Sequence, residues 1–266
     1  MYIKQIKSFF RFTIEAILIA AIFIVAHHYK KMLPHYALDP KDMPEYLKGI
    51  ITADNFKTTD FPAIGSEEHK QDFTKLHVWQ NKRTEEQCHA AYGQRHAKIQ
   101  EFYPEYTFFF DDLSNKDLVF IYGIVQETNK IIELKKNHYA RPRPFNADLT
   151  LEPCPEIGRI GDYAYPSGHS VLAGMFEGIM IAIDPENSDK IKEHAWQACV
   201  NRVIAGVHHP SDIQAGYALG HEIFKEFAKN KDFTDRLEKL HKRYIRQSKI
   251  RKIIQNSGLG FILDKL

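Results

Sequence analysis

Apolar residues recur at helical spacing over most of the chain after its first quarter, and this pattern limits the fold more than any other feature. The clearest case is the stretch with Leu118, Ile121 and Ile124, which follows Ser114 and Asp117, a pair spaced like an N-cap and its partner. No stretch alternates apolar and polar residues as a half-buried strand does. The pattern predicts helices over residues 67–99, 118–136, 169–183, 188–207, from 210 onward and 232–255. We therefore expect an all-α fold built as a single compact helical bundle.

Residues 137–166 interrupt this helical pattern. Prolines stand at positions 142, 144, 153, 155 and 166. Proline lacks a backbone N–H and disrupts a helix interior, so the cluster predicts a long loop. Because long irregular stretches in compact domains are often functional, we expect this loop to contribute to a site.

The N-terminus has the pattern of an export signal. Lys4, Lys7 and Arg11 precede an uninterrupted apolar run over residues 16–26. The run is too short for a membrane span, which needs about 20 apolar residues, and fits the apolar centre of a signal peptide. An uncleaved anchor over residues 9–26 is the alternative, and a buried core helix is the least favoured interpretation. We expect an exported protein, attached to a membrane only if this segment is retained.

The predicted organisation has four parts. Residues 1–26 are the signal peptide or anchor, and residues 27–59 are an irregular lead-in. Residues 60–230 form the catalytic helical domain, and residues 231–266 form a basic C-terminal helix and tail. The net charge of +2 is too small to indicate nucleic acid as a partner. The oligomeric state is left open, homo-oligomers included.

Three cysteines, Cys88, Cys154 and Cys199, allow two interpretations. In an oxidising compartment one pair could form a disulfide and leave one thiol over. Three separately buried thiols are the alternative, and the sequence does not choose between them. No Cys-x-x-Cys pair is present, so a structural zinc site is not expected.

Three segments carry residue types suited to phosphoryl transfer: residues 136–144, 165–169 and 202–212. A phosphoryl group in transfer carries negative charge on its oxygens, and catalysis consists mainly of positioning and electrostatic stabilisation. Guanidinium groups can bind two oxygens at once, and a Ser-Gly turn at a helix N-terminus adds backbone N–H donors. A neutral histidine oriented by a carboxylate can attack phosphorus, and a second, protonated histidine can protonate the leaving group.

In this order the three segments resemble the signature of the type 2 phosphatidic-acid phosphatase superfamily, which includes the vanadium haloperoxidases. The segments are Lys136-x6-Arg143-Pro144, Pro166-Ser167-Gly168-His169 and Asn201-Arg202-x5-His208-x3-Asp212. Within that superfamily the sequence most resembles the class A bacterial non-specific acid phosphatases. The resemblance covers about residues 60–230. It implies an all-α fold, a periplasmic or secreted location, and the hydrolysis of a broad range of small phosphomonoesters without a metal or other cofactor.

The resemblance also assigns roles. It implies that His208 is the nucleophile, Asp212 its orienting partner and His169 the general acid. The implied phosphate-binding residues are Lys136, Arg143, Ser167, Gly168 and Arg202. Asn201 stands where the family has serine, which puts the detail of the phosphate contacts in question. His209 misses the motif spacing by one residue and is interpreted as a neighbour of the nucleophile.

Other functions are compatible with parts of this pattern. A soluble phosphatase acting on lipid phosphates and a vanadium-dependent haloperoxidase would share these motifs. A non-catalytic phosphate-binding module is the least favoured, because binding alone needs no nucleophile. A metallohydrolase using His208, His209 and Asp212 is the remaining alternative, and a chelator distinguishes it from a metal-free enzyme.

Overall fold

The computed structural model describes residues 43–52 and 55–257, and the predicted export segment and most of the lead-in lie outside them. The described residues up to Ile245 form one compact unit, and residues 246–256 are the last part of the final helix. Within the described residues the chain is helical and contains no strand, which confirms the predicted all-α fold. None of the helices described is long and apolar enough to cross a membrane.

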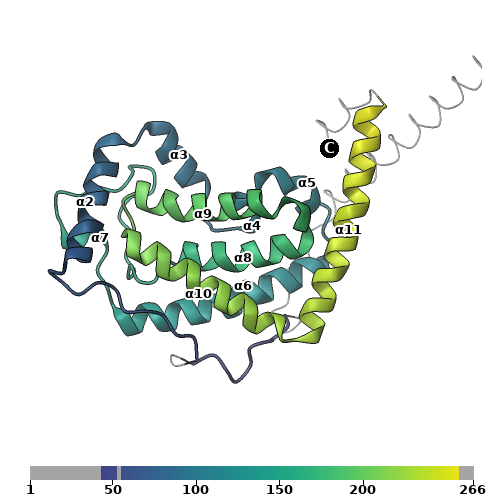
Figure 1. The fold of residues 1–266 in the computed structure, drawn as a ribbon, viewed down its shortest axis with the longest axis horizontal. Helices are drawn as coiled ribbons and strands as arrows, with labels where there is room; N and C mark the ends of the chain where they lie inside the picture. Colours follow the sequence, from purple (N-terminus) through teal and green to yellow (C-terminus); the bar gives the residue numbers. More distant parts are fainter. Residues whose placement is uncertain (1–42, 53–54, 258–266) are drawn as a thin grey trace, which may run out of the picture. The chain divides into compact units, whose positions relative to one another are not determined.

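The helices agree closely with those expected from the sequence, as Figure 1 shows. They are α2 (Glu67–Lys82), α3 (Glu85–Gly93), α4 (Ile99–Phe102), η2 (Pro104–Tyr106), α5 (Thr107–Phe110), α6 (Asn115–Tyr139), α7 (Pro144–Ala147), α8 (Gly168–Ile183), η3 (Pro185–Asn187), α9 (Ser188–Ile204), α10 (Pro210–Ala228) and α11 (Lys231–Asn256). The Ser114–Asp117 pair forms a reciprocal capping box at the start of α6.

The helical pattern over residues 67–99 corresponds to two helices, α2 and α3, followed by a turn. The helix α2 ends at Lys82, because Arg83 is extended and Thr84 caps α3. The Thr84 side chain accepts the N–H of Gln87, and the Gln87 side chain accepts the N–H of Thr84. These two hydrogen bonds cap the start of a new helix, and the spacing of apolar residues does not indicate such a cap.

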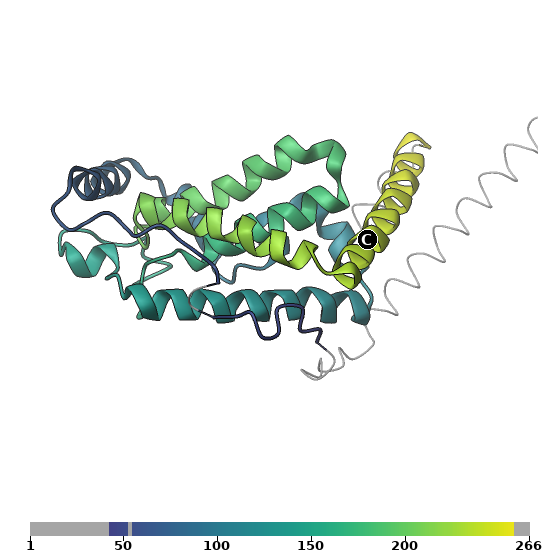
Figure 2. The ribbon, with the colours of Figure 1, turned by 60° about the horizontal axis from the view of Figure 1, so that its bottom comes forward.

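The centre of the fold is α8, which packs mainly against α10 and α9 (Figure 1). Its residues are apolar on nearly every side, as expected of a helix enclosed by others. Figure 2 shows α6 running alongside this group. A Cβ atom added to Gly220 of α10 would collide with the backbone oxygen of Val171 on α8. The close approach of α8 and α10 therefore requires glycine at this position.

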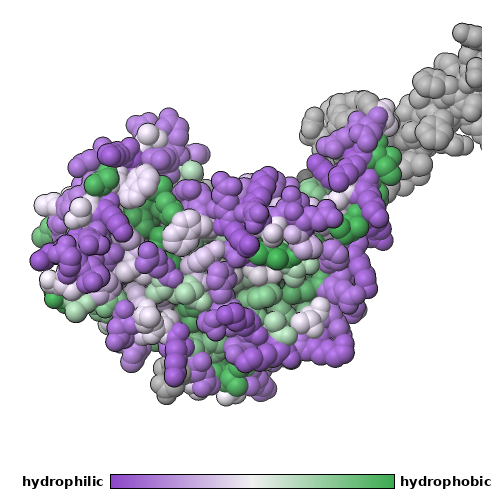
Figure 3. All heavy atoms as spheres, in the orientation of Figure 1, coloured by the Kyte–Doolittle hydropathy of each residue, from purple (hydrophilic) through white to green (hydrophobic). Residues whose placement is uncertain are grey.

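Polar side chains dominate the face seen in Figure 3, and apolar atoms show in a band where α8 lies between α9 and α10. At the far end of α8, Asp184 ties three segments together. Its carboxylate accepts the hydroxyls of Tyr106 and Tyr244, each at 2.7 Å. The middle of α11 is thereby fixed to the end of α8.

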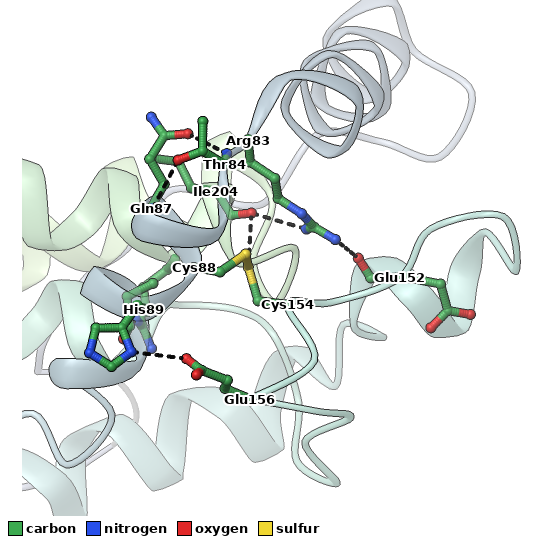
Figure 4. The surroundings of a disulfide bond; sticks show 11 residues. Arg83, Thr84, Gln87, Cys88, His89, Glu152, Cys154, Glu156 and Ile204 are labelled. Atoms are coloured by element: carbon green, nitrogen blue, oxygen red, sulfur yellow. Dashed lines mark hydrogen bonds and ion pairs between the residues drawn. A yellow bond between two sulfur atoms is a disulfide. The ribbon is translucent and has the colours of Figure 1, made fainter.

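The predicted loop is present between α6 and α8, with the short α7 inside it. Cys88 of α3 and Cys154 of the loop form a disulfide (Figure 4), and Cys199 is a buried free thiol. This is the first of the two interpretations of the three cysteines. Beside the disulfide, Arg83 donates to the backbone oxygens of Ile204 at 3.1 Å and Glu152 at 2.6 Å. The first part of the loop is therefore attached both to α3 and to the end of α9.

Candidate active site

A pocket of about 600 Å³ brings together most of the residues that the sequence singled out. Its walls include Lys136, Arg143, Gly168, His169, Arg202 and His208. These residues come from α6, the following loop, α8, α9 and the turn before α10. The remaining two predicted residues, Ser167 and Asp212, are fully buried behind this wall.

The ring of His208 lies between a cation and a carboxylate. Its Nε2 is 2.7 Å from Nη1 of Arg143, and its Nδ1 is 3.5 Å from Oδ2 of Asp212. A guanidinium nitrogen can only donate, so Nε2 is the unprotonated acceptor and the ring proton is on Nδ1, facing Asp212. Burial and the charge of Arg143 hold the pKa of His208 well below its usual value. The ring is therefore neutral, with the lone pair of Nε2 on the cationic side.

Asp212 is shared by two adjacent histidines. Its Oδ2 accepts the backbone N–H of His209 at 2.7 Å and lies 3.0 Å from Nδ1 of the same residue. Burial alone would raise the pKa of Asp212, but His209, His208 and Arg141 together hold it well below its usual range. His209 packs edge-on against Phe73 and is not part of the pocket wall. The structure thus places it beside the nucleophile candidate, as the motif spacing predicts.

The residues behind Asp212 were not predicted from the sequence. Nη1 of Arg141 donates to Oδ1 of Asp212 at 2.6 Å, and its Nη2 donates to Asp72 of α2 at 3.0 Å. Asp72 in turn accepts the backbone N–H of Ser211 at 3.0 Å. The sequence did offer one signal for them, because an additional arginine, Arg141, lies two residues before Arg143. This buried chain of charges fixes the carboxylate that faces His208.

The three predicted cations are held from different directions. Burial and the charge of Arg143 lower the pKa of Lys136. Arg143 also donates from Nη1 to the backbone oxygen of Val207 at 2.7 Å, which fixes its guanidinium beside His208. Burial lowers the pKa of Arg202 to about 10, so this group remains charged at neutral pH. Arg202 donates from Nη2 to the backbone oxygen of Ala91, and its Nε is buried without a hydrogen-bond partner among the described residues. An anion in the pocket would give that donor an acceptor.

The Ser167–His169 turn opens α8 toward the pocket. Ser167 caps the helix by accepting the N–H of Ser170, and its own N–H donates to the backbone oxygen of Asp212 at 3.1 Å. The Nε2 of His169 lies 3.1 Å and 3.2 Å from the backbone oxygens of Gln94 and Arg95. Burial and the charge of Arg202 lower the pKa of His169 to about 3. His169 is therefore neutral in the free protein near neutral pH.

Asn201, the one departure from the expected motif, acts on a neighbouring loop. Its amide donates to the side-chain oxygen of Gln94 at 2.8 Å, and its own oxygen accepts from Gln197 at 2.8 Å. Gln94 presents the backbone oxygen that meets His169. Asn201 therefore positions the partner of His169 and does not line the pocket.

A further acidic residue lies on the pocket wall where the sequence predicted only cations. The carboxylate of Asp162 binds Lys136 through Oδ2 and Arg143 through Oδ1. Burial alone would raise the pKa of Asp162, but the hydrogen bond from Lys136 and the charge of Arg143 lower it to about 2. In the part of the chain that the structure describes, no group of three or more His, Cys, Asp or Glu side chains is placed to hold a metal ion.

These features define an all-α protein with a histidine–aspartate pair set against a cationic pocket. Residues 116–228 match the model of the PAP2 superfamily, and they include every predicted site residue. The chain is 32% identical over 87 residues to a non-specific acid phosphatase of Salmonella typhi, an alignment covering 32% of this chain and 35% of that protein. It is 30% identical over 108 residues to a non-specific acid phosphatase of Providencia stuartii, covering 39% and 43%. The resemblance to acid phosphatases of the PAP2 superfamily, predicted from the motifs, is confirmed.

The alignments span less than half the length of either relative. The fold has a counterpart among solved structures. A bacterial vanadium-dependent iodoperoxidase superposes with a TM-score of 0.50 at 18% identity, covering 67% of this chain and 54% of that one. At this level of identity the likeness extends to the fold alone.

Proposed function

We propose that the chain is a phosphatase that hydrolyses phosphate monoesters through a phosphohistidine on His208. One observation carries the proposal: Nη1 of Arg143 lies 2.7 Å from Nε2 of His208. The unprotonated nitrogen therefore faces a guanidinium that can bind phosphate oxygens, in a pocket that Lys136 and Arg202 also line. The similarity to acid phosphatases supports the same conclusion.

In the first step, the lone pair of Nε2 on His208 attacks phosphorus and the bond from phosphorus to the ester oxygen breaks. The cations Lys136, Arg143 and Arg202 stabilise the charge on the transferring oxygens. As Nε2 becomes bonded, the ring acquires positive charge, which Asp212 stabilises from the Nδ1 side. The ester binds as a monoanion and its proton passes to neutral His169, which then protonates the leaving oxygen so that it departs as an alcohol.

In the second step, water attacks the phosphohistidine and the bond between phosphorus and nitrogen breaks. His169, neutral again, accepts a proton from that water and passes it to the product phosphate. The products are inorganic phosphate, the alcohol and free His208, and His169 ends neutral as in the free protein. No redox step is involved.

The adjacent histidines offer a matched test. We expect His208→Ala to abolish both turnover of p-nitrophenyl phosphate and any acid-labile phosphoenzyme trapped by rapid quenching. His209→Ala should keep a trappable phosphoenzyme, because its ring contacts Asp212 and Phe73 but none of the pocket cations. Wild-type turnover should persist in EDTA and be inhibited by orthovanadate. Labelled phosphate on the His208→Ala protein, or activity lost to EDTA and restored by a divalent ion, would contradict the mechanism.

We further propose that the protein works outside the cytoplasm, in the periplasm or as a secreted protein. The Cys88–Cys154 disulfide supports this, because disulfides persist mainly in oxidising compartments. A fusion of residues 1–40 to a reporter active only after export tests the proposal. A well-expressed but silent reporter would count against it.

A further inference from the structure

A single carboxylate bridges two of the three cations proposed to bind phosphate. Oδ2 of Asp162 accepts from Nζ of Lys136, and Oδ1 accepts from Nη2 of Arg143. The two oxygens of the Asp162 carboxylate thus each bind a different cation. Two oxygens of a phosphate group could bind the same two cations in the same way. Asp162 therefore occupies the N–H donors of Lys136 and Arg143 that the proposed function assigns to the phosphate group of the substrate.

The backbone beside Asp162 holds the same two cations independently of its carboxylate. Nζ of Lys136 donates to the backbone oxygen of Tyr163 at 2.7 Å. Nε of Arg143 donates to the backbone oxygen of Asp162 at 3.0 Å, and Nη1 donates to Val207 at 2.7 Å. The orientation of both cations is thus fixed by neutral acceptors. The carboxylate adds negative charge without being needed to place them.

The segment that carries Asp162 is attached at its ends and exposed in between. Cys154 is fixed by the disulfide, and the N–H of Ala164 donates to the backbone oxygen of Arg141 at 2.9 Å. Between them the chain has no regular structure around Gly161, which has open space on its Cβ side. The Asp162 side chain is 52% exposed. Its carboxylate can therefore turn into solvent without moving a helix.

We propose that Asp162 is a resident anion of the active site, which the phosphate group of the substrate must displace from Lys136 and Arg143. This role rests on the proposed function and specifies what sets phosphate affinity in that site. Only the fraction of molecules in which the carboxylate has moved away can bind, so the apparent dissociation constant equals the intrinsic one divided by that fraction. The same competition favours release of the product phosphate.

The competition persists in acid. Because the pKa of Asp162 is lowered to about 2, the carboxylate stays ionised across the range in which an acid phosphatase acts. Substrate and product therefore meet the same competitor at pH 4 as at pH 7.

The test is calorimetric titration of the full-length protein with inorganic phosphate at pH 6. Asp162→Asn keeps the shape of the side chain and removes its charge. We expect it to bind phosphate about tenfold more tightly, because phosphate no longer has to displace a half-exposed ionic contact from the two cations. Glu156→Gln is the matched control, because it removes the same charge from the same loop where Glu156 faces His89, 3.5 Å away. It should bind phosphate as the wild type does.

A second measurement separates this role from a positioning role. The product-inhibition constant for phosphate should fall by the same factor in Asp162→Asn and in Asp162→Ala. Unchanged phosphate binding in both variants would show that Asp162 does not compete with phosphate. Weaker binding in both would show that Asp162 is needed to place the cations. Either result would overturn the proposal. If phosphate binds to none of the proteins, wild type included, the proposed function fails as well. Unchanged affinity in the variants leaves that function standing and removes only the role of Asp162.

Discussion

The proton that His169 delivers should arrive with the substrate, and the dependence of kcat/KM on pH reveals this. With a pKa of about 3, His169 is protonated in about one molecule in ten thousand at pH 7. A phosphate monoester has a second pKa of about 6 and carries a proton below that pH. Neutral His169 with a monoanionic ester holds the same number of protons as protonated His169 with a dianionic ester. A monoanionic ester can therefore supply the proton that the leaving group needs.

The expected profile follows from the two pKa values. Between about pH 3 and pH 6, the protonated fraction of His169 falls tenfold per unit while the dianionic fraction of the ester rises tenfold, so kcat/KM stays flat. Above about pH 6 the ester is fully dianionic, and kcat/KM should fall about tenfold per pH unit. Protonation of His208 does not interrupt the upper part of the plateau, because its pKa lies well below its usual value.

Two alkyl phosphates with different second pKa values provide the assay. Both have poor leaving groups that need protonation, and one carries fluorine so that its second pKa is lower. Phosphate release measured from pH 4 to pH 9 should place the falling limb at a lower pH for the fluorinated ester. His169→Gln should lower the rate for both esters by about 10²–10⁴-fold. A limb at the same pH for both esters would refute the reasoning, because an enzyme group would then control it.

Two further predictions concern stability and are measured by urea denaturation. Arg141→Met should lower the free energy of unfolding by about 3–5 kcal/mol, because it leaves Asp72 and Asp212 as buried carboxylates without their shared cation; a loss below 1 kcal/mol would contradict this. Gly220→Ala should cost about 1–3 kcal/mol, because the added Cβ meets the backbone of α8. Gly93→Ala, where nothing lies within 4 Å of the new Cβ, is the control and should show no such loss.

The helical fold could be predicted because its signals are local. The capping residue Ser114 and the apolar spacing that follows define α6 without reference to the rest of the chain. Pro210 is likewise found at the first position of α10, where a missing N–H costs nothing. The break at Thr84 was missed because a capping pair there overrides a continuous pattern of long side chains. A hydrogen bond between neighbours decided the boundary, and apolar spacing does not detect it.

The candidate site was only half predictable, for a related reason. Motif order indicated which cations gather, and the pocket does bring Lys136, Arg143 and Arg202 together. Their partners come from distant positions that carry no motif. Asp72 lies 69 residues from Arg141, and Asp162 lies 26 residues from Lys136. Any of the chain's many Asp residues could have served, and only the packing of α2 and the loop against the site selects these two.

The structure also gives a physical reason for preferring His208 over His209, a choice that the sequence made on spacing alone. Both rings face the same oxygen of Asp212, and His209 is the closer at 3.0 Å against 3.5 Å. Contact with the carboxylate therefore does not identify a nucleophile. What differs is the other side of the ring: His208 presents an unprotonated nitrogen to Arg143, whereas His209 packs against Phe73. In the proposed mechanism the nucleophile must meet a phosphate bound by the cations, and of these two histidines only His208 contacts one of those cations.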